Sequence, residues 1–377
     1  RFHAAAEARP DEGGWKGMSE VVEGNAEDLA RLSGSLLPSE AVAVVNAASR
    51  AHLRCHRQLL ERRRREGKVR HCHGDLHLRN IVLLDDRPVL FDCIEFNESF
   101  ACIDVLYDLA FLIMDLEERG LRPQAWMLLQ RYVEITGEAE GLALLPLFVG
   151  VRAAIRAKVE GFGATMQQDT GERLEATSRA RAYLALARSA LEPAPPRLVA
   201  IGGRSGTGKS SLAATLAPSI GPLPGAVVVR SDVVRKRLFG RQPPERLPAE
   251  AYRPEVSERV FEEVASVARR LLDAGHAVIA DGVYGQPDQR AGIEAVADAA
   301  EVPFTGSWLT APEAVMERRV EGRTGDASDA DARVIRLQRA IDDSAIGWER
   351  IRADRTLDAV AADALALWPQ ADAAVAG

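Results

Sequence analysis

Residues 202–211 read GGRSGTGKSS, and their types and spacing suit the binding of phosphate. Gly203, Gly208, Lys209 and Ser210 fit the pattern G-x-x-x-x-G-K-[ST]. Glycines let backbone N–H groups turn toward phosphate oxygens, and the positive end of a following helix adds to that attraction. The segment therefore predicts a phosphate-binding loop. A plain glycine-rich turn is the alternative.

The neighbours of this loop supply the required context. The apolar run 198–201 predicts a strand before it, and 209–217 predicts a helix after it. Lys209 would reach the β- and γ-phosphates of a nucleotide, and the Ser210 hydroxyl would bind Mg²⁺. We expect ATP contacts from Gly203, Arg204, Ser205, Gly206, Thr207, Gly208, Lys209, Ser210 and Ser211.

Two acidic residues end later apolar runs. Asp232 follows the run 226–230, and Asp281 follows 277–280. Strand ends line the ligand crevice of an open α/β sheet, so Asp232 is placed to orient or deprotonate an acceptor hydroxyl. It could instead cap a helix beginning at Val233. Asp281 could hold the water shell of Mg²⁺ or contact the acceptor.

An arginine pair follows the fourth predicted strand, 304–309. Arg319 and Arg323 have the spacing R-x-x-x-R and could cover a transferring phosphoryl group, which develops negative charge. The alternative is ordinary helix-surface arginine, which applies more to Arg318 than to Arg319 or Arg323.

Residues 197–358 resemble small-molecule P-loop kinases of the gluconate kinase, polynucleotide kinase and zeta-toxin type. The resemblance rests on the loop, the two strand-end acids and the arginine segment. It implies a parallel α/β sheet and use of ATP with Mg²⁺.

A second phosphoryl-transfer pattern lies near the start of the chain. It reads His73-Gly74-Asp75, then Asn80 five residues after Asp75, then Asp92. Asp75 can orient a hydroxyl and accept its proton, while Asn80 and Asp92 can offer oxygens to Mg²⁺. A polar loop with incidental acids is the alternative.

This pattern resembles the catalytic loop of the aminoglycoside phosphotransferase family, over residues 2–191. The resemblance implies a helical, kinase-like C-terminal lobe, and it makes Asp104 and Asp108 structural braces. Nothing before His73 supplies the family's β-rich N-terminal lobe, so we expect either that the chain is a fragment lacking that lobe or that this domain is inactive as it stands. His71, His73 and His77 are expected to anchor the loop by hydrogen bonds.

Two basic groups have a plain interpretation. The run 61–67, with four consecutive arginines, predicts a solvated helix end, although it could mark a nucleic-acid patch. Arg152, Arg156 and Lys158 could face an anionic substrate, but a solvated helix face is the default expectation.

The remaining pattern divides the chain at a proline-rich linker, 192–196. Before it, we expect a mainly helical domain, 1–191, with helices at 39–65, 126–133, 145–162 and 172–191 and a hairpin whose second strand, 89–96, carries Asp92. After it, strands alternate with helices at 255–274, 286–300 and from 312, which predicts a P-loop domain, 197–377, with a parallel sheet. The fold class is α/β overall.

The 377 residues carry a net charge of −7, which counts against a nucleic-acid partner. The four cysteines (Cys55, Cys72, Cys93 and Cys102) fit no metal pattern and are expected to be buried free thiols in a reducing cytoplasm. No apolar run reaches the roughly 18 residues that would span a membrane. The oligomeric state is open.

Together these features predict a bifunctional, cytoplasmic, ATP- and Mg²⁺-dependent phosphotransferase acting on a hydroxyl of a small, sugar-like molecule. The arrangement resembles bacterial fusions of an aminoglycoside phosphotransferase-like domain with a P-loop ATP-binding domain of the AAA family. A regulatory nucleotide switch and a nucleic-acid or toxin-type kinase are the alternatives.

Overall fold

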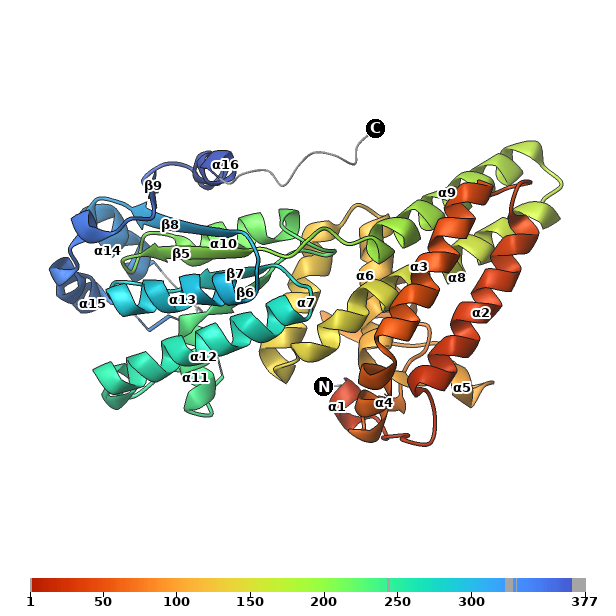
Figure 1. Ribbon diagram of the computed structural model, residues 1–377, viewed down its shortest axis with the longest axis horizontal. Coiled ribbons are helices and arrows are strands. Elements are labelled where there is room, and N and C mark those ends of the chain that lie inside the picture. Colours follow the sequence, from red (N-terminus) through yellow and green to blue (C-terminus); the bar gives the residue numbers. More distant parts are fainter. Residues whose placement is uncertain (1, 243–244, 323–327, 330, 368–377) are drawn as a thin grey trace. The chain divides into compact units, whose positions relative to one another are not determined.

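The computed structural model describes residues 2–242, 245–322, 328–329 and 331–367, and it divides into two compact units (Figure 1). The N-terminal unit comprises Arg1–Ala194 with Pro222–Pro224, and the C-terminal unit comprises Pro195–Gly221 with Gly225–Gly377.

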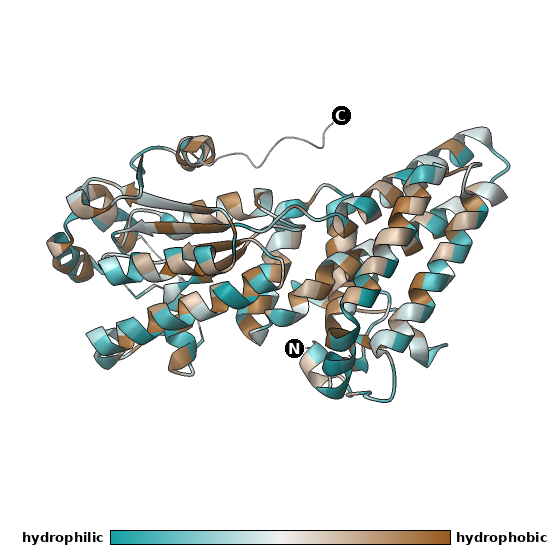
Figure 2. Cartoon of the chain, viewed as in Figure 1, coloured by the Kyte–Doolittle hydropathy of each residue, from teal (hydrophilic) through white to brown (hydrophobic). Residues whose placement is uncertain are grey.

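The N-terminal unit is mainly helical. Its helices are α1 (Phe2–Ala5), α2 (Gly14–Leu32), α3 (Ser39–Cys55), α4 (Arg57–Arg65), α5 (Glu98–Ala101), α6 (Val105–Glu118), α7 (Arg122–Thr136), α8 (Leu145–Met166) and α9 (Thr170–Leu191). The long helices α2, α3, α8 and α9 pack side by side, α6 packs against α8, and α7 packs against α6 (Figure 1). Along the long helices, hydrophobic and hydrophilic residues are interspersed, as in amphipathic helices that bury one face (Figure 2).

Two short antiparallel strand pairs complete this unit. Strand β1 (Val69–His71) pairs with β4 (Cys102–Asp104), and β2 (Ile81–Leu84) pairs with β3 (Arg87–Leu90). The β2–β3 turn consists of Asp85 and Asp86, whose φ angles are 49° and 56°. Aspartate tolerates this left-handed conformation, which suits a two-residue hairpin turn.

Three expectations for this unit are wrong in detail. The helix predicted over 39–65 is broken at His56, which has φ −99° and ψ 15°, and no glycine or proline marks the break. Strand β3 ends at Leu90 instead of continuing to residue 96, because Asp92 adopts a left-handed φ of 59° that a strand does not accommodate. Cys72 and Cys102 are buried free thiols, but Cys55 and Cys93 are exposed.

The arginine run at the end of α4 contains one buried residue, which the prediction of a solvated helix end missed. Arg63 is 3% exposed. Its Nε and Nη2 donate to the Asp104 carboxylate at 2.7 and 2.9 Å, and its Nη1 lies 3.0 Å from Glu138 Oε2. Asp104 also caps α6 by accepting from Leu106 N at 2.8 Å. Arg63 therefore joins three segments through a buried ionic network.

Arg63→Ala is expected to lower the free energy of unfolding of the N-terminal unit by about 3–5 kcal/mol, since it leaves the buried Asp104 carboxylate without its cation and Glu138 with Lys68 alone, at 3.6 Å. Denaturant unfolding measures this loss. The neighbouring Arg62→Ala is the matched control: Arg62 pairs with Glu140 on the surface and should cost at most about 1 kcal/mol. Equal losses for both variants would contradict a structural role for the buried network.

The C-terminal unit is a five-stranded parallel sheet in the order β6-β7-β5-β8-β9 (Figure 1). The strands are β5 (Leu198–Gly203), β6 (Val227–Arg230), β7 (Val278–Asp281), β8 (Phe304–Thr310) and β9 (Glu349–Arg352). The helices are α10 (Lys209–Leu216), α11 (Ser231–Leu238), α12 (Pro254–Asp273), α13 (Pro287–Ala299), α14 (Glu313–Glu321), α15 (Ala332–Leu337) and α16 (Leu357–Leu367). The α/β fold class is thus confirmed, and β9 is a strand that the sequence pattern did not predict.

Burial of both sheet faces explains the continuous apolar strands. All six residues of β5 are buried, as in a parallel sheet covered by helices on each side. Helices α12 and α13 pack against each other on the sheet, and α10 packs with α16 (Figure 1). The register pairs Asp281 with Ile201 on one side and Arg230 on the other, so three strand ends meet at one edge.

In the described part of the chain, no helix has both the length and the apolar character needed to cross a lipid bilayer.

Candidate functional site

The loop between β5 and α10 has the backbone geometry of a phosphate cradle. Gly203, Gly206 and Gly208 have φ angles of 142°, 84° and 96°, which side-chain-bearing residues rarely adopt. A Cβ atom at Gly203 would lie 2.7 Å from the Leu309 carbonyl oxygen, and one at Gly206 would lie 2.6 Å from that of Met316. Glycine is therefore required at Gly203 and Gly206, because another backbone segment lies too close for a side chain, and at all three positions because φ is positive.

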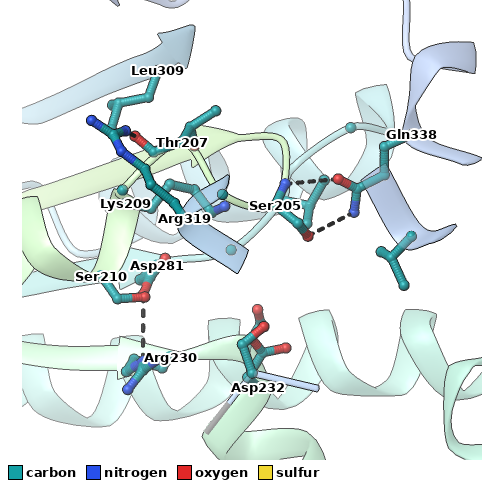
Figure 3. A pocket seen from close by; sticks show the side chains of 18 of the residues that line it. Ser205, Thr207, Lys209, Ser210, Arg230, Asp232, Asp281, Leu309, Arg319 and Gln338 are labelled. Atoms are coloured by element: carbon teal, nitrogen blue, oxygen red, sulfur yellow. Dashed lines mark hydrogen bonds and ion pairs between the residues drawn. The ribbon is translucent and has the colours of Figure 1, made fainter. Parts of the chain in front are cut away.

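Lys209 and Ser210 begin α10 at the end of this cradle. Lys209 Nζ donates to the Arg204 carbonyl oxygen at 3.0 Å. Ser210 Oγ donates to Asp281 Oδ2 at 2.5 Å, and the two side chains lie next to each other in Figure 3. Arg230 Nε lies 3.6 Å from the same carboxylate oxygen. The hydroxyl and the carboxylate are oxygen donors of the kind that Mg²⁺ prefers, so the residues present fit a nucleotide phosphate with its metal ion.

Asp281 is 4% exposed, and its surroundings act on the pKa of its carboxyl in opposite directions. Burial raises its pKa, while the positive charges of Arg230 and Lys209 and the Ser210 hydroxyl oppose that rise. Asp281 is thus a buried acid whose ionised form depends on nearby cations.

A cavity of about 950 Å³ extends from the loop across the strand ends. Its lining includes loop residues 205–211, Asp281 and, on α11, Asp232 and Arg235. Asp232 lies within the first turn of α11, whose N-cap is Arg230, so the alternative that Asp232 caps a helix starting at Val233 is wrong. Its half-buried carboxylate is directed toward the cavity (Figure 3).

Arg319 lies on α14 and faces the loop. Its Nη1 donates to the Thr207 carbonyl oxygen at 3.2 Å (Figure 3). Its Nη2 donates to the Ala353 carbonyl oxygen at 2.8 Å. Arg318, on the same helix, is exposed. The second predicted lid arginine, Arg323, lies outside the described residues.

Gln338 and Arg235 are among the cavity residues that the sequence analysis missed. Gln338 accepts from Ser205 N at 2.7 Å through Oε1, and its Nε2 donates to Ser205 Oγ at 3.1 Å (Figure 3). Arg235 is 7% exposed and donates to the Ala251 carbonyl oxygen. Its spacing of three residues from Asp232 on a helix could have identified it, whereas nothing local marks Gln338.

Two of the loop residues predicted to contact nucleotide lie away from the cavity lining. Gly203 is the last residue of β5, and the Arg204 guanidinium donates to the Ile341 carbonyl oxygen and to Asp343 Oδ2 at 3.2 and 3.1 Å. Residues 205–211 line the cavity.

The N-terminal unit brings Asp75 and Asn80 together. Asn80 Nδ2 donates to Asp75 Oδ2 and to the Asp75 carbonyl oxygen, each at 3.0 Å. This leaves the Asn80 amide oxygen as the atom available to a cation. The pKa of Asp75 is lowered, chiefly by a hydrogen bond from His77, whose Nε2 lies 3.3 Å from Asp75 Oδ2.

Asp92 is exposed, and backbone contacts on either side of it hold its segment. Phe91 N donates to the Asn80 carbonyl oxygen at 3.1 Å, and Ile94 N donates to that of His73 at 3.0 Å. His73 Nε2 is 2.9 Å from the Phe91 carbonyl oxygen. The expectation that His73 anchors the loop is confirmed.

Asp108 braces the same loop from α6. Its carboxylate is fully buried and accepts from His73 N and Gly74 N at 3.3 and 2.9 Å. The expectation of structural roles for Asp104 and Asp108 is therefore confirmed. The predicted sites thus fall into two sets: Asp75, Asn80 and Asp92 in the N-terminal unit, and Ser210, Asp232, Asp281 and Arg319 in the C-terminal unit.

Family comparison agrees with this division. Residues 1–144 match the family described as "Phosphotransferase enzyme family", and residues 198–341 match the family described as "AAA domain". The chain therefore carries a phosphotransferase-family domain followed by a AAA-type P-loop domain, which confirms the predicted pairing. Similar proteins include uncharacterized proteins of Mycobacterium tuberculosis and Mycobacterium bovis, each 34% identical over 274 residues. These matches cover 72% of this chain, which spans about half (53%) of each relative's length.

Solved structures similar to this chain include a gluconokinase from Sinorhizobium meliloti, at 19% identity and a TM-score of 0.32, covering 46% of this chain and 90% of that one. Another is the Mycobacterium tuberculosis APS kinase CysC in complex with AMPPNP and APS, at 23% identity and a TM-score of 0.34, covering 46% of this chain and 97% of that one. Likeness at this level carries no argument about substrate.

Proposed function

We propose that the chain is an ATP- and Mg²⁺-dependent phosphotransferase whose acceptor is a hydroxyl of a small polar molecule, with ATP bound by the C-terminal unit. The single observation that carries this proposal is the 2.5 Å contact between Ser210 Oγ and Asp281 Oδ2, beside a glycine cradle that opens into the cavity containing Asp232. A donor site and an acceptor-side carboxylate thus share one cavity.

Each residue of the C-terminal site has a proposed role. The N–H groups of residues 205–211 and the Lys209 ammonium bind the nucleotide phosphates. Ser210 and Asp281 hold the metal ion, which neutralises charge on the phosphates. Asp232 orients the acceptor hydroxyl and takes its proton. Arg319 fixes the loop through Thr207 and offers positive charge to the transferring group.

The N-terminal unit is proposed as a second phosphoryl-transfer site. Asp75 would orient an acceptor hydroxyl, and the Asn80 amide and Asp92 carboxylate would offer oxygens to Mg²⁺. The lowered pKa of Asp75 supports this role, because it keeps the carboxylate ionised and able to accept a hydrogen bond.

The proposal is tested by incubating the full chain with ATP and Mg²⁺ over a panel of sugars and polyols and measuring ADP release and phosphorylated product. We expect at least one acceptor to stimulate ADP release with matching product. ADP release that no acceptor stimulates would instead favour a regulatory nucleotide switch, and stimulation by oligonucleotides alone would favour a nucleic-acid kinase.

Arg319→Ala is expected to lower kcat for ATP turnover by about a hundredfold, the size of effect seen when one charge-stabilising donor is removed. The change also frees the Thr207 carbonyl group at the loop. Steady-state kinetics measure the loss. Arg318→Ala, one position earlier on α14 and exposed, serves as the control and should retain turnover within about twofold. Equal effects of the two changes would contradict a specific role for Arg319.

A further inference from the structure

A second cavity, of about 600 Å³, lies within the N-terminal unit and is lined by residues of α2, α6 and α8 together with Asp75. Met18, Phe111 and Phe148 give it apolar walls. A largely apolar cavity of this size with a few polar groups is typical of small-molecule sites.

Arg152 of α8 lines this cavity and is buried, with 6% of its surface exposed. This contradicts the expectation of a solvated helix face. Its guanidinium carbon lies 3.9 Å from the Tyr107 ring centre and 4.7 Å from that of Phe111, and its Nε is 3.4 Å from the Tyr107 carbonyl oxygen. Among the described residues, no carboxylate lies within ion-pairing distance of Arg152. The Asp75 charge acts on Arg152 only from beyond that distance. A buried cation that no carboxylate contacts is costly, so it calls for a binding partner.

Three polar atoms from three helices lack hydrogen-bond partners at this cavity, counting the described residues only. They are Arg152 Nη2 on α8, the Tyr107 hydroxyl on α6 and Asn25 Oδ1 on α2. All three residues are at least nine-tenths buried. Buried polar groups in proteins are almost always satisfied, so three such atoms around one cavity indicate a polar ligand.

The other charged groups around the cavity are already neutralised or exposed. Asp104 pairs with Arg63, Arg156 lies 3.1 Å from Glu160, and Lys158 lies 2.9 Å from Asp28. Asp11 and Glu12 pair with Arg9 at 3.0 and 3.9 Å, while Lys16 and Glu20 are exposed.

This leaves Arg152 and Asp75 as the charges that a ligand in the cavity would meet. The unpartnered atoms complement an oxyanion, through the guanidinium, and hydroxyl groups, through an amide oxygen and a phenol.

We propose that this cavity binds a hydroxyl-bearing small molecule that carries an oxyanion, such as a phosphorylated or carboxylated sugar, with Arg152 on the oxyanion and Asp75 facing a hydroxyl. The cation–π contacts with Tyr107 and Phe111 hold the guanidinium in place for that contact. The proposal rests on the role proposed above for Asp75 in the N-terminal unit, and it does not depend on turnover by the P-loop site.

The test is isothermal titration calorimetry on the full chain carrying Lys209→Ala, so that phosphate binding at the P-loop does not contribute. The probes are glucose 6-phosphate, glucuronate and neutral glucose. At least one anionic sugar should bind more than about tenfold more tightly than glucose, as expected for one charge-assisted hydrogen bond, and the tighter of the two identifies phosphate or carboxylate as the preferred oxyanion. Equal or undetectable binding of all three would overturn the proposal.

Arg152→Met, added to the same chain, should weaken binding of the anionic sugar by about tenfold to a hundredfold. Because it removes an unpaired buried charge, it should leave the thermal unfolding midpoint unchanged or raise it. Arg131→Met, on the exposed face of α7, is the matched control and should change neither quantity. A lower midpoint with unchanged binding would make Arg152 a structural brace and refute the proposal.

Tyr107→Phe provides an independent variant in case Arg152→Met does not fold. It removes one unpartnered hydroxyl and keeps the ring under the guanidinium. Binding of the anionic sugar should weaken several-fold, and the thermal unfolding midpoint should stay the same. Unchanged binding would contradict the proposal that the sugar binds in this cavity.

Discussion

Replacing Lys209 by alanine is expected to lower ATP turnover by the full chain by at least about a hundredfold, since one preorganised positive charge at the phosphates is lost. Lys209 begins α10 and donates to the Arg204 carbonyl oxygen within the loop, so its ammonium is held close to the cradle. A coupled assay of ADP release measures the effect. Because Lys209 is only partly buried, the variant should keep the unfolding midpoint of the parent.

The control for this prediction is Arg269→Ala, an exposed change on α12 where Arg269 pairs with Asp273. It should retain turnover within about twofold. If Lys209→Ala left ATP turnover unchanged, the nucleotide would have to bind elsewhere, and the assignment of the P-loop as the ATP site would be wrong.

Asp281→Asn is expected to lower Mg²⁺-dependent turnover by about a hundredfold or more, because the anionic oxygen next to Ser210 is replaced by a neutral amide. Turnover measured over a Mg²⁺ titration should show a higher Mg²⁺ requirement in the variant. Asp273→Asn, an exposed change on α12, is the control. An unchanged Mg²⁺ requirement would contradict a metal-holding role for Asp281.

The same change should also alter the pH dependence of stability. A carboxyl whose pKa is raised on folding adds stability below its unfolded pKa, and that contribution is lost as pH rises through the folded pKa. Burial raises the pKa of Asp281, whereas asparagine does not titrate. Asp281→Asn should therefore become more stable relative to the wild type as pH rises from the unfolded pKa of the carboxyl through its raised folded pKa. Denaturant unfolding at several pH values measures this.

Local patterns account for what the sequence analysis predicted correctly. The apolar runs, the glycine spacing and the adjoining Lys209 and Ser210 specify a strand, a loop and a helix within twenty residues. The place of Asp281 at the end of β7 was predictable because it ends an apolar run, and parallel strands place their ends at one edge. The loop from His73 to Asp92 was also identifiable from a local pattern, because its characteristic residues lie close together in the sequence.

Contacts between residues far apart in the chain account for the features that the sequence analysis could not predict. Arg63 and Arg62 look alike in a run of four arginines, and only the fold places Arg63 against Asp104 and Glu138. Arg152 reads as a helix-surface cation until α6 is known to pack beside it. Gln338 reaches Ser205 across 133 residues of sequence, a separation over which no spacing rule applies.

The most direct test of the central claim is transfer of the γ-phosphate of radiolabelled ATP to an organic acceptor by the full chain, compared between the wild type and Lys209→Ala. The account predicts acceptor-dependent labelled product from the wild type and loss of that product in the variant. Label released only as inorganic phosphate whatever acceptor is present, or equal product from both proteins, would contradict it.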